Sequence, residues 1–206
     1  MTNNSTSQES SIDEDYVLDR VEVVPQLIED TQGTLFVSGL AGASKDLAAL
    51  TNDGTNIFTM AGAMGAGAML GLGLALAQPR HRVIVMTGDG ELLMNVGALA
   101  TIAVMAPSNL ALLCIDNGHY GETGYQRSHT SLGVDLEAMA KGAGITNTAT
   151  LSSTDNLEAG RELLNRRQGP CFVLLKVKPT DPPAFRRLLD PAACRYRFRQ
   201  ALLGHF

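Results

Sequence analysis

Residues 83–117 read VIVMTGDGELLMNVGALATIAVMAPSNLALLCIDN, and two polar positions stand at equivalent points in this stretch. Asp89 lies in a glycine turn directly after the apolar run 83–87, and Asn117 follows the apolar run 109–115. Asn117 comes 28 residues after Asp89, which is the length of one crossover helix and one strand. The stretch therefore predicts two neighbouring parallel strands, each followed by a polar side chain.

Apolar and amphipathic segments alternate through the rest of the chain. Short apolar runs predict further strands at 34–38, 56–60, 147–151 and 171–177. Helical spacing or capping signals predict helices over 15–29, over 45–51 behind an N-cap at Ser44, over 61–77, 92–105 and 135–142, and over 157–166 behind Ser153 or Thr154. Strands alternating with helices predict an α/β fold, with a doubly wound, mostly parallel sheet flanked by helices.

Length and composition limit the domain organisation. The 206 residues suffice for one compact domain with a substantial core. Charged residues make up 18% and the net charge is −5, so nothing suggests a nucleic-acid-binding surface. We expect residues 1–12 to be a disordered tail and 13–178 to be the folded domain. The proline- and arginine-rich segment 179–206 either docks on a partner or caps the domain.

The cysteines, the N-terminus and the apolar segments indicate the cellular compartment of the protein. Cys114, Cys171 and Cys194 are an odd number without CxxC spacing, which argues against a disulfide framework or a zinc site. The polar N-terminus has no signal-peptide pattern. The glycine- and alanine-rich segment 61–77 ends at Gln78-Pro79, so we expect a buried helix rather than a membrane span. These features predict a cytoplasmic protein.

Asp89 and Asn117 carry the chemistry that we expect from the fold. Ligands bind open α/β sheets at the carboxyl ends of the strands, where these two side chains would be neighbours. A carboxylate and an amide oxygen are hard ligands that suit Mg²⁺ or Ca²⁺, and backbone N–H groups at Gly90 suit a diphosphate. Either turn alone is most often only a turn, but the pair at this spacing is a more specific signal.

The same residues resemble a known motif. A GDG turn followed by an Asn after the next strand resembles the diphosphate-binding motif of thiamine-diphosphate-dependent enzymes. GAMGAG at 62–67 is similar to the segment that holds the pyrimidine of this cofactor in acetolactate synthases and 2-oxoacid decarboxylases. The runs 88–103 and 116–126 most resemble the β subunit of sulfopyruvate and phosphonopyruvate decarboxylases. The likeness covers about residues 34–178.

The resemblance implies a role for particular residues. Asp89, Asn117 and the backbone carbonyl of His119 would be the ligands of Mg²⁺. The backbone N–H groups of Gly90 and Glu91 would bind the diphosphate. Met64 would be the apolar wedge beneath the thiazolium. The full set of cofactor-binding residues implied for thiamine diphosphate is Gly62, Ala63, Met64, Gly88, Asp89, Gly90, Glu91, Asn117, His119, Tyr120 and Gly121.

The resemblance also implies a reaction and a partner. The family reaction is non-oxidative decarboxylation of a 2-oxoacid, which releases CO₂ and an aldehyde. The glutamate that activates the cofactor lies on a separate pyrimidine-binding domain in this family, and 206 residues hold only one of the two domains. We therefore expect the chain to be inactive alone. The active site would form with a pyrimidine-binding α subunit, as an α2β2 unit or a multiple of it.

Several positions leave the substrate and the role open. Glu91 stands where a small residue is usual after GDG, and Glu122 stands in YGETG where the relatives tend to have Ser. A carboxylate at Glu122 would repel an anionic substrate tail if it faces the reacting carbon. Glu122 and His119 are the candidate acid–base groups, although a solvated loop carboxylate is the plainer interpretation of Glu122. His129, Tyr120 and Gln126 are candidates for the mouth of the site.

Three alternative functions remain at this point. The chain could belong to a carboligase of the acetolactate synthase kind. It could be a non-catalytic regulatory subunit, although the intact pair of Asp89 and Asn117 argues against a lost site. It could also be a nucleotide-binding module, but there is no GxxxxGK[ST] motif.

Overall fold

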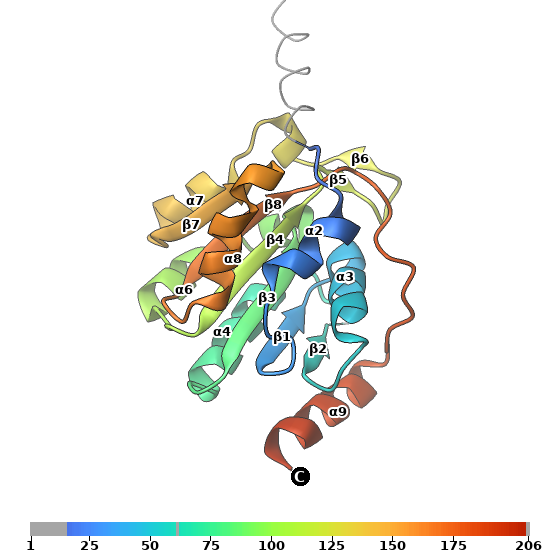
Figure 1. The fold of residues 1–206 in the computed structure, drawn as a ribbon, viewed down its shortest axis with the longest axis vertical. Coiled ribbons are helices and arrows are strands. Elements are labelled where there is room, and N and C mark those ends of the chain that lie inside the picture. Colours follow the sequence, from blue (N-terminus) through green and yellow to red (C-terminus); the bar gives the residue numbers. More distant parts are fainter. Residues whose placement is uncertain (1–15, 61, 205–206) are drawn as a thin grey trace, which may run out of the picture.

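The computed structural model describes residues 16–60 and 62–204, which form a six-stranded sheet with helices on both faces (Figure 1). Every strand pair within this sheet is parallel, and the strand order is β2-β1-β3-β4-β8-β7. The strands are β1 Thr34–Ser38, β2 Ile57–Thr59, β3 Arg82–Gly88, β4 Leu110–Asp116, β7 Asn147–Leu151 and β8 Cys171–Lys176. The predicted doubly wound α/β sheet is confirmed.

Two apolar cores lie on opposite faces of the sheet. One face is covered by α2 (Arg20–Leu27), α3 (Ala41–Thr51) and α8 (Leu157–Asn165), and the other by α4 (Gly67–Ala77), α6 (Ala98–Met105) and α7 (Leu136–Ala143). Side chains of β3 alternate between the cores: Ile84 and Met86 enter the first, Val83 and Val85 the second. The central strands are apolar throughout because both faces are buried.

The glycine-rich segment packs closely on the sheet through α4. A Cβ atom on Gly71 would lie 2.1 Å from a methyl carbon of Val85, so only glycine allows this approach. The outer face of α4 stays apolar, with Met69 and Leu76 exposed. Among the described residues, the helices are too short or too polar to cross a bilayer.

Four helices differ from the sequence prediction. The helix predicted over 61–77 begins only at Gly67, because residues 62–66 form turns and irregular backbone. Helix α2 begins behind Asp19 and ends at Leu27, shorter than the predicted 15–29. The predicted helix 92–105 is split into α5 (Asp89–Leu93) and α6, because Asn95 turns to donate to the carbonyl of Gly65 and breaks the helix. Helix α3 already begins at Ala41, so Ser44 lies inside the helix and does not cap it. The hydroxyl of Ser44 donates to the backbone carbonyl of Ala41.

The C-terminal segment crosses to the other end of the sheet and finishes in α9 (Pro191–Leu203), beside β2 (Figure 1). The backbone nitrogen of Thr59 lies 3.3 Å from the thiol sulfur of Cys194. The rings of Phe58 and Phe198 meet edge to face, with their centroids 5.8 Å apart. This helix therefore covers the edge of the sheet formed by β2. The predicted tail 1–12 lies outside the described residues.

Candidate active site

A cavity of about 280 Å³ lies at the carboxyl ends of β1, β3 and β4. Most of the residues predicted for the site line it: Met64, Gly88, Asp89, Gly90, Glu91, Asn117, His119, Tyr120, Gly121 and Glu122. Gly62 and Ala63 are exposed and lie outside the lining, as do Gln126 and His129. The turns after neighbouring strands thus come together as their spacing in the sequence predicts.

Asp89 begins α5, and two hydroxyl groups hold its buried carboxylate. The hydroxyl of Ser128 donates to one carboxylate oxygen, and that of Thr130 lies 3.1 Å from the same oxygen. Burial raises the pKa of Asp89, and the hydrogen bond from Ser128 and the nearby hydroxyl of Thr130 partly oppose this. Hydroxyl groups that hold a carboxylate in this way fix its orientation toward a ligand.

A second buried acid, Asp116, lies behind Asp89 at the end of β4. Its carboxylate accepts hydrogen bonds from the Thr130 hydroxyl at 2.7 Å, the Gly118 backbone at 2.9 Å and the Tyr16 hydroxyl at 3.3 Å. Burial, and then the charge of Asp89, raise the pKa of Asp116 to about 6. Thr130 therefore bridges two acids whose like charges disfavour each other. Sequence reasoning missed this bridge, since Thr130 is distant from both acids in the chain.

Asn117 and His119 form the turn that leads into the hairpin β5 (His119–Tyr120) and β6 (Gln126–Arg127). The side-chain oxygen of Asn117 accepts from the backbone nitrogen of His119 at 3.1 Å. Nδ1 of His119 lies 2.9 Å from the backbone carbonyl of Asn117, so this contact needs a proton on Nδ1. The turn thereby places the amide of Asn117 in the wall of the cavity.

The donor set fits a divalent cation that carries a diphosphate. The carboxylate of Asp89 and the amide oxygen of Asn117 are hard ligands on one cavity. A Cβ atom on Gly90 would lie 2.4 Å from the ring of Tyr120, so this position must stay glycine. At Gly88 the nearest atom would be 4.0 Å away, which leaves the backbone accessible. Met64, half exposed beside this backbone, offers an apolar contact to a ligand.

The side chain of Glu91 has a role that sequence reasoning missed, since only its backbone was considered. One carboxylate oxygen accepts from the Leu40 backbone at 3.0 Å and from the Thr87 hydroxyl at 3.0 Å. The other oxygen is buried and has no partner within the described part of the chain. Burial raises the pKa of Glu91. A Cβ atom on Gly39 would lie 1.7 Å from the carboxylate, so glycine is needed there.

Two cations line the cavity, Arg20 at the start of α2 and Lys45 on α3, and no local pattern in the sequence indicates either. Arg20 is buried and forms an ion pair with Asp46, with Nε 3.1 Å from both carboxylate oxygens. Lys45 is half buried and lines the same cavity, and no hydrogen bond or ion pair holds it among residues 16–60 and 62–204. Lys45 is therefore a charge available to a ligand.

The hairpin and the C-terminal segment enclose the mouth of the cavity. The hydroxyl of Tyr125 donates to a carboxylate oxygen of Asp181 at 3.0 Å, and both residues line the cavity. The hydroxyl of Tyr120 lies 3.0 Å from Nδ1 of His129, which connects the predicted mouth residues. Glu122 is exposed. Its charge therefore faces solvent rather than a dry interior.

Comparisons with known proteins agree with this geometry. Residues 41–175 match the family "Thiamine pyrophosphate enzyme, C-terminal TPP binding domain". Sulfopyruvate decarboxylase subunit beta of Methanocaldococcus jannaschii is 35% identical over 185 residues, which are 89% of this chain and 96% of the relative. Phosphonopyruvate decarboxylase of Streptomyces viridochromogenes is 38% identical over 84% of this chain and 43% of its own length.

A solved structure supports the same assignment. An X-ray structure from Mycobacterium smegmatis, described as a thiamin diphosphate-dependent enzyme, superimposes with a TM-score of 0.62 and 26% sequence identity. The match covers 78% of this chain and 31% of the other. These findings confirm the resemblance seen in the sequence. The chain belongs to the thiamine pyrophosphate enzyme family, in which it corresponds to the C-terminal TPP binding domain.

Proposed function

We propose that the chain is the diphosphate-binding β subunit of a thiamine-diphosphate-dependent decarboxylase. The reaction is the non-oxidative decarboxylation of a 2-oxoacid of the sulfopyruvate or phosphonopyruvate type, which yields CO₂ and an aldehyde. The observation that carries the proposal is the single cavity that brings Asp89, Asn117 and Met64 together in a domain of this family. The M. jannaschii β subunit, matched over 96% of its length, supports the assignment as a subunit.

In this proposal the chain holds one end of the cofactor. The side chains of Asp89 and Asn117 and the carbonyl of His119 bind Mg²⁺, and the N–H groups of Gly90 and Glu91 bind the diphosphate. The hydroxyls of Ser128 and Thr130 keep the Asp89 carboxylate aimed at the cation. Bound thiamine diphosphate supplies the nucleophilic carbon and the electron sink.

An exposed apolar surface supports the requirement for a partner. The neighbouring helices α4 and α6 leave Met69, Leu76, Val104 and Met105 exposed. Met94 is 60% exposed and also lines the cavity, so apolar surface reaches the rim of the site. Exposed apolar side chains on neighbouring helices are typical of protein interfaces. We assign it to a pyrimidine-binding α subunit that completes the site, in an α2β2 unit or a multiple of it.

Lys45 supports a substrate with a second acidic group. The ammonium group of Lys45 is half buried on the cavity wall and has no counter-ion among the described residues, so it attracts an anion more strongly than an exposed group does. Glu122, which would repel such a tail, is exposed and therefore screened by water and salt. In this proposal Lys45 binds the acidic tail of a sulfonate or a phosphonate, against the carboxylates of Glu122 and Asp181 that line the same cavity.

The test is to reconstitute the complex with a candidate α subunit, Mg²⁺ and thiamine diphosphate, and to assay CO₂ release from 2-oxoacids. Activity should need both chains and should be lost in Asp89→Asn, which removes the charge that binds the cation. Glu122→Gln is the matched control, and we expect it to keep most of the activity. Full activity of this chain alone would contradict the proposal, and formation of a carboligation product instead of an aldehyde would reassign the reaction.

A further inference from the structure

A second cavity, of about 250 Å³, lies at the opposite edge of the sheet, where β1 and β3 begin. Three arginines line it, from three different turns or strand starts: Arg80, Arg82 and Arg167. The other lining residues are Glu29, Asp30, Gly33, Thr34 and Asn165. None of these residues belongs to the site already described.

Arg82 is a buried cation that has no carboxylate partner among the residues that the structure describes. Its side chain is buried at the first position of β3, where Nε and one terminal nitrogen each donate at 3.0 Å to the carbonyls of Leu164 and Leu163. These carbonyls end α8, so they supply only partial negative charge. The other terminal nitrogen, Nη1, is buried and has no hydrogen-bond partner within 16–60 and 62–204. Burial, together with the nearby charge of Arg167, lowers the pKa of Arg82.

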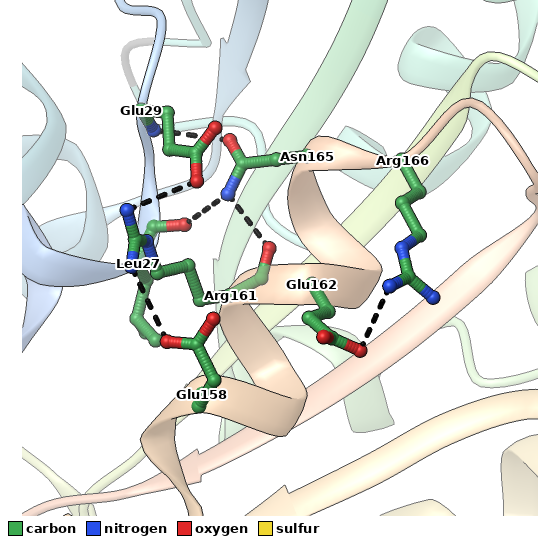
Figure 2. Close-up of polar contacts among 7 residues, drawn as sticks. All are labelled: Leu27, Glu29, Glu158, Arg161, Glu162, Asn165 and Arg166. Atoms are coloured by element: carbon green, nitrogen blue, oxygen red, sulfur yellow. Dashed lines mark hydrogen bonds and ion pairs between the residues drawn. The ribbon is translucent and has the colours of Figure 1, made fainter.

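The two carboxylates that line this cavity have partners other than its arginines. Glu29 pairs with Arg161 of α8 at 3.0 Å (Figure 2). One oxygen of Asp30 accepts from the backbone nitrogens of Gln32 and Gly33, at 3.0 and 2.8 Å. In the described part of the chain, no ion pair joins either acid to an arginine of the cavity.

The amide of Asn165 is also fully used. Its oxygen accepts from the Glu29 backbone at 3.0 Å, and its nitrogen donates to the carbonyls of Leu27 and Arg161 at 2.8 and 2.7 Å (Figure 2). Asn165 thus holds the chain before β1 against α8 and gives the cavity a rigid wall.

Two exposed arginines complete the arrangement. Arg80 has no hydrogen bond or ion pair with any described residue, and Arg167 makes one bond, to the carbonyl of Pro79 at 3.1 Å. Buried charges in proteins are normally paired, because an unpaired one is costly. Here the buried guanidinium of Arg82 lines the inner wall of the cavity. The exposed guanidinium groups of Arg80 and Arg167, which have unused N–H donors, line its entrance. Forked guanidinium groups match the planar or tetrahedral oxygens of carboxylate and phosphate.

We propose that this cavity binds the oxyanion group of a small molecule, a phosphate or a carboxylate, between Arg80 and Arg167 and in front of Arg82. The bound anion supplies the counter-charge that none of the residues 16–60 and 62–204 offers to Arg82. The site is separate from the proposed cofactor site, since β3 begins at one and ends at the other. The inference therefore does not depend on the proposed function.

Thermal unfolding of the chain with millimolar inorganic phosphate, against sodium chloride at equal ionic strength, tests the site. We expect phosphate to raise the Tm by about 2–4 °C, as ligand linkage requires for binding of moderate affinity. The double variant Arg80→Gln/Arg167→Gln should lose this rise. Both side chains are exposed, so the variant should still fold.

A matched double variant controls for charge. Arg166→Gln/Arg199→Gln removes the same amount of positive charge from two exposed arginines that do not line the cavity. Arg166 forms an ion pair with Glu162, which is not a residue of the cavity (Figure 2). This variant should keep the rise. Phosphate that acts by general salting out, or at the cofactor cavity, would raise the Tm of all the proteins equally and would overturn the proposal. Repeating the titration with succinate separates phosphate from carboxylate, and no rise with either anion would also overturn it.

Discussion

The backbone nitrogen of Leu40 donates to a carboxylate oxygen of Glu91 across 3.0 Å, which joins the turn after β1 to the start of α5. Both ends of this bond lie in the wall of the cavity, so it sets the distance between two of the turns that form the candidate site. Glu91 is therefore a positioning residue in the structure, besides any role of its backbone.

Replacing Glu91 should separate its acceptor role from its charge. Glu91→Ala leaves the Leu40 N–H and the Thr87 hydroxyl without an acceptor, and should cost about 1–3 kcal/mol of the free energy of unfolding. Glu91→Gln keeps an acceptor oxygen and removes a buried charge, so its stability should stay within about 1 kcal/mol of the parent. Urea unfolding of the cofactor-free chain measures both. Equal losses in the two variants would show that the charge, not the acceptor, matters.

Asp116 predicts how the stability of the cofactor-free chain depends on pH. Its pKa in the folded chain is about 6, above the ordinary value of 3.8, so the native state binds this proton more tightly than the unfolded state does. The stabilisation is complete below about pH 4 and is lost as the pH rises through about 6. Burial raises the pKa values of Asp89 and Glu91 too, in the same direction.

Asp116→Asn is the test of this pH dependence, because an amide imitates the protonated acid. The variant should gain about 1–3 kcal/mol relative to the parent at neutral pH and little at about pH 4. Denaturant unfolding across this range gives the comparison. A variant that is equally destabilised at both pH values would mean that the hydrogen bonds of Asp116 outweigh its charge.

Lys45 predicts a specificity effect in the reconstituted enzyme. Lys45→Gln should raise the KM for a 2-oxoacid with a sulfonate or phosphonate tail by about tenfold, the loss expected for one charge-assisted contact. The KM for pyruvate, which lacks the tail, should change little. Lys141→Gln is the control, since that lysine is exposed and pairs with Glu137 on α7. An equal rise in KM for both substrates would indicate that Lys45 contacts the cofactor and not the substrate tail.

Two glycines of α4 should respond in opposite directions to the same substitution. Gly71→Ala inserts a methyl group against Val85 and should cost about 1–3 kcal/mol of the free energy of unfolding. Gly73 is exposed, and a Cβ atom there would meet nothing within 4 Å, so Gly73→Ala should stabilise the helix by up to about 1 kcal/mol. Thermal unfolding of the isolated chain compares them. Destabilisation by both would indicate that α4 bends at these glycines.

The sequence predicted the parts of the site that follow strands directly. The apolar runs that end before Asp89 and at Ile115 predicted where the two strands end. Because neighbouring parallel strands end at the same edge of a sheet, the two turns that follow them were expected to lie close together. β1 and β7 match their predicted residues, since short apolar or β-branched runs between turn residues mark strands clearly. Motif spacing also indicated the family, which the comparisons confirm.

Contacts between distant segments could not be predicted in this way. Thr130 meets Asp89 across 41 residues, and Glu91 meets Leu40 across 51, so no local pattern reveals either pair. Lys45 and Arg82 look like ordinary surface charges in the sequence, and only the fold shows what surrounds them. The break between α5 and α6 depends on Asn95 reaching Gly65, another contact that the fold supplies.

The cover that α9 places over β2 has a consequence for self-association. The thiol of Cys194 contacts the backbone nitrogen of Thr59 and the carbonyl of Ile57, which are groups that a foreign strand would otherwise use. An open row of such groups invites edge-to-edge aggregation. Helix α9 thus blocks this edge of the sheet against pairing with another strand. Deletion of α9 would expose the edge of β2 and leave the chain prone to polymerise through it.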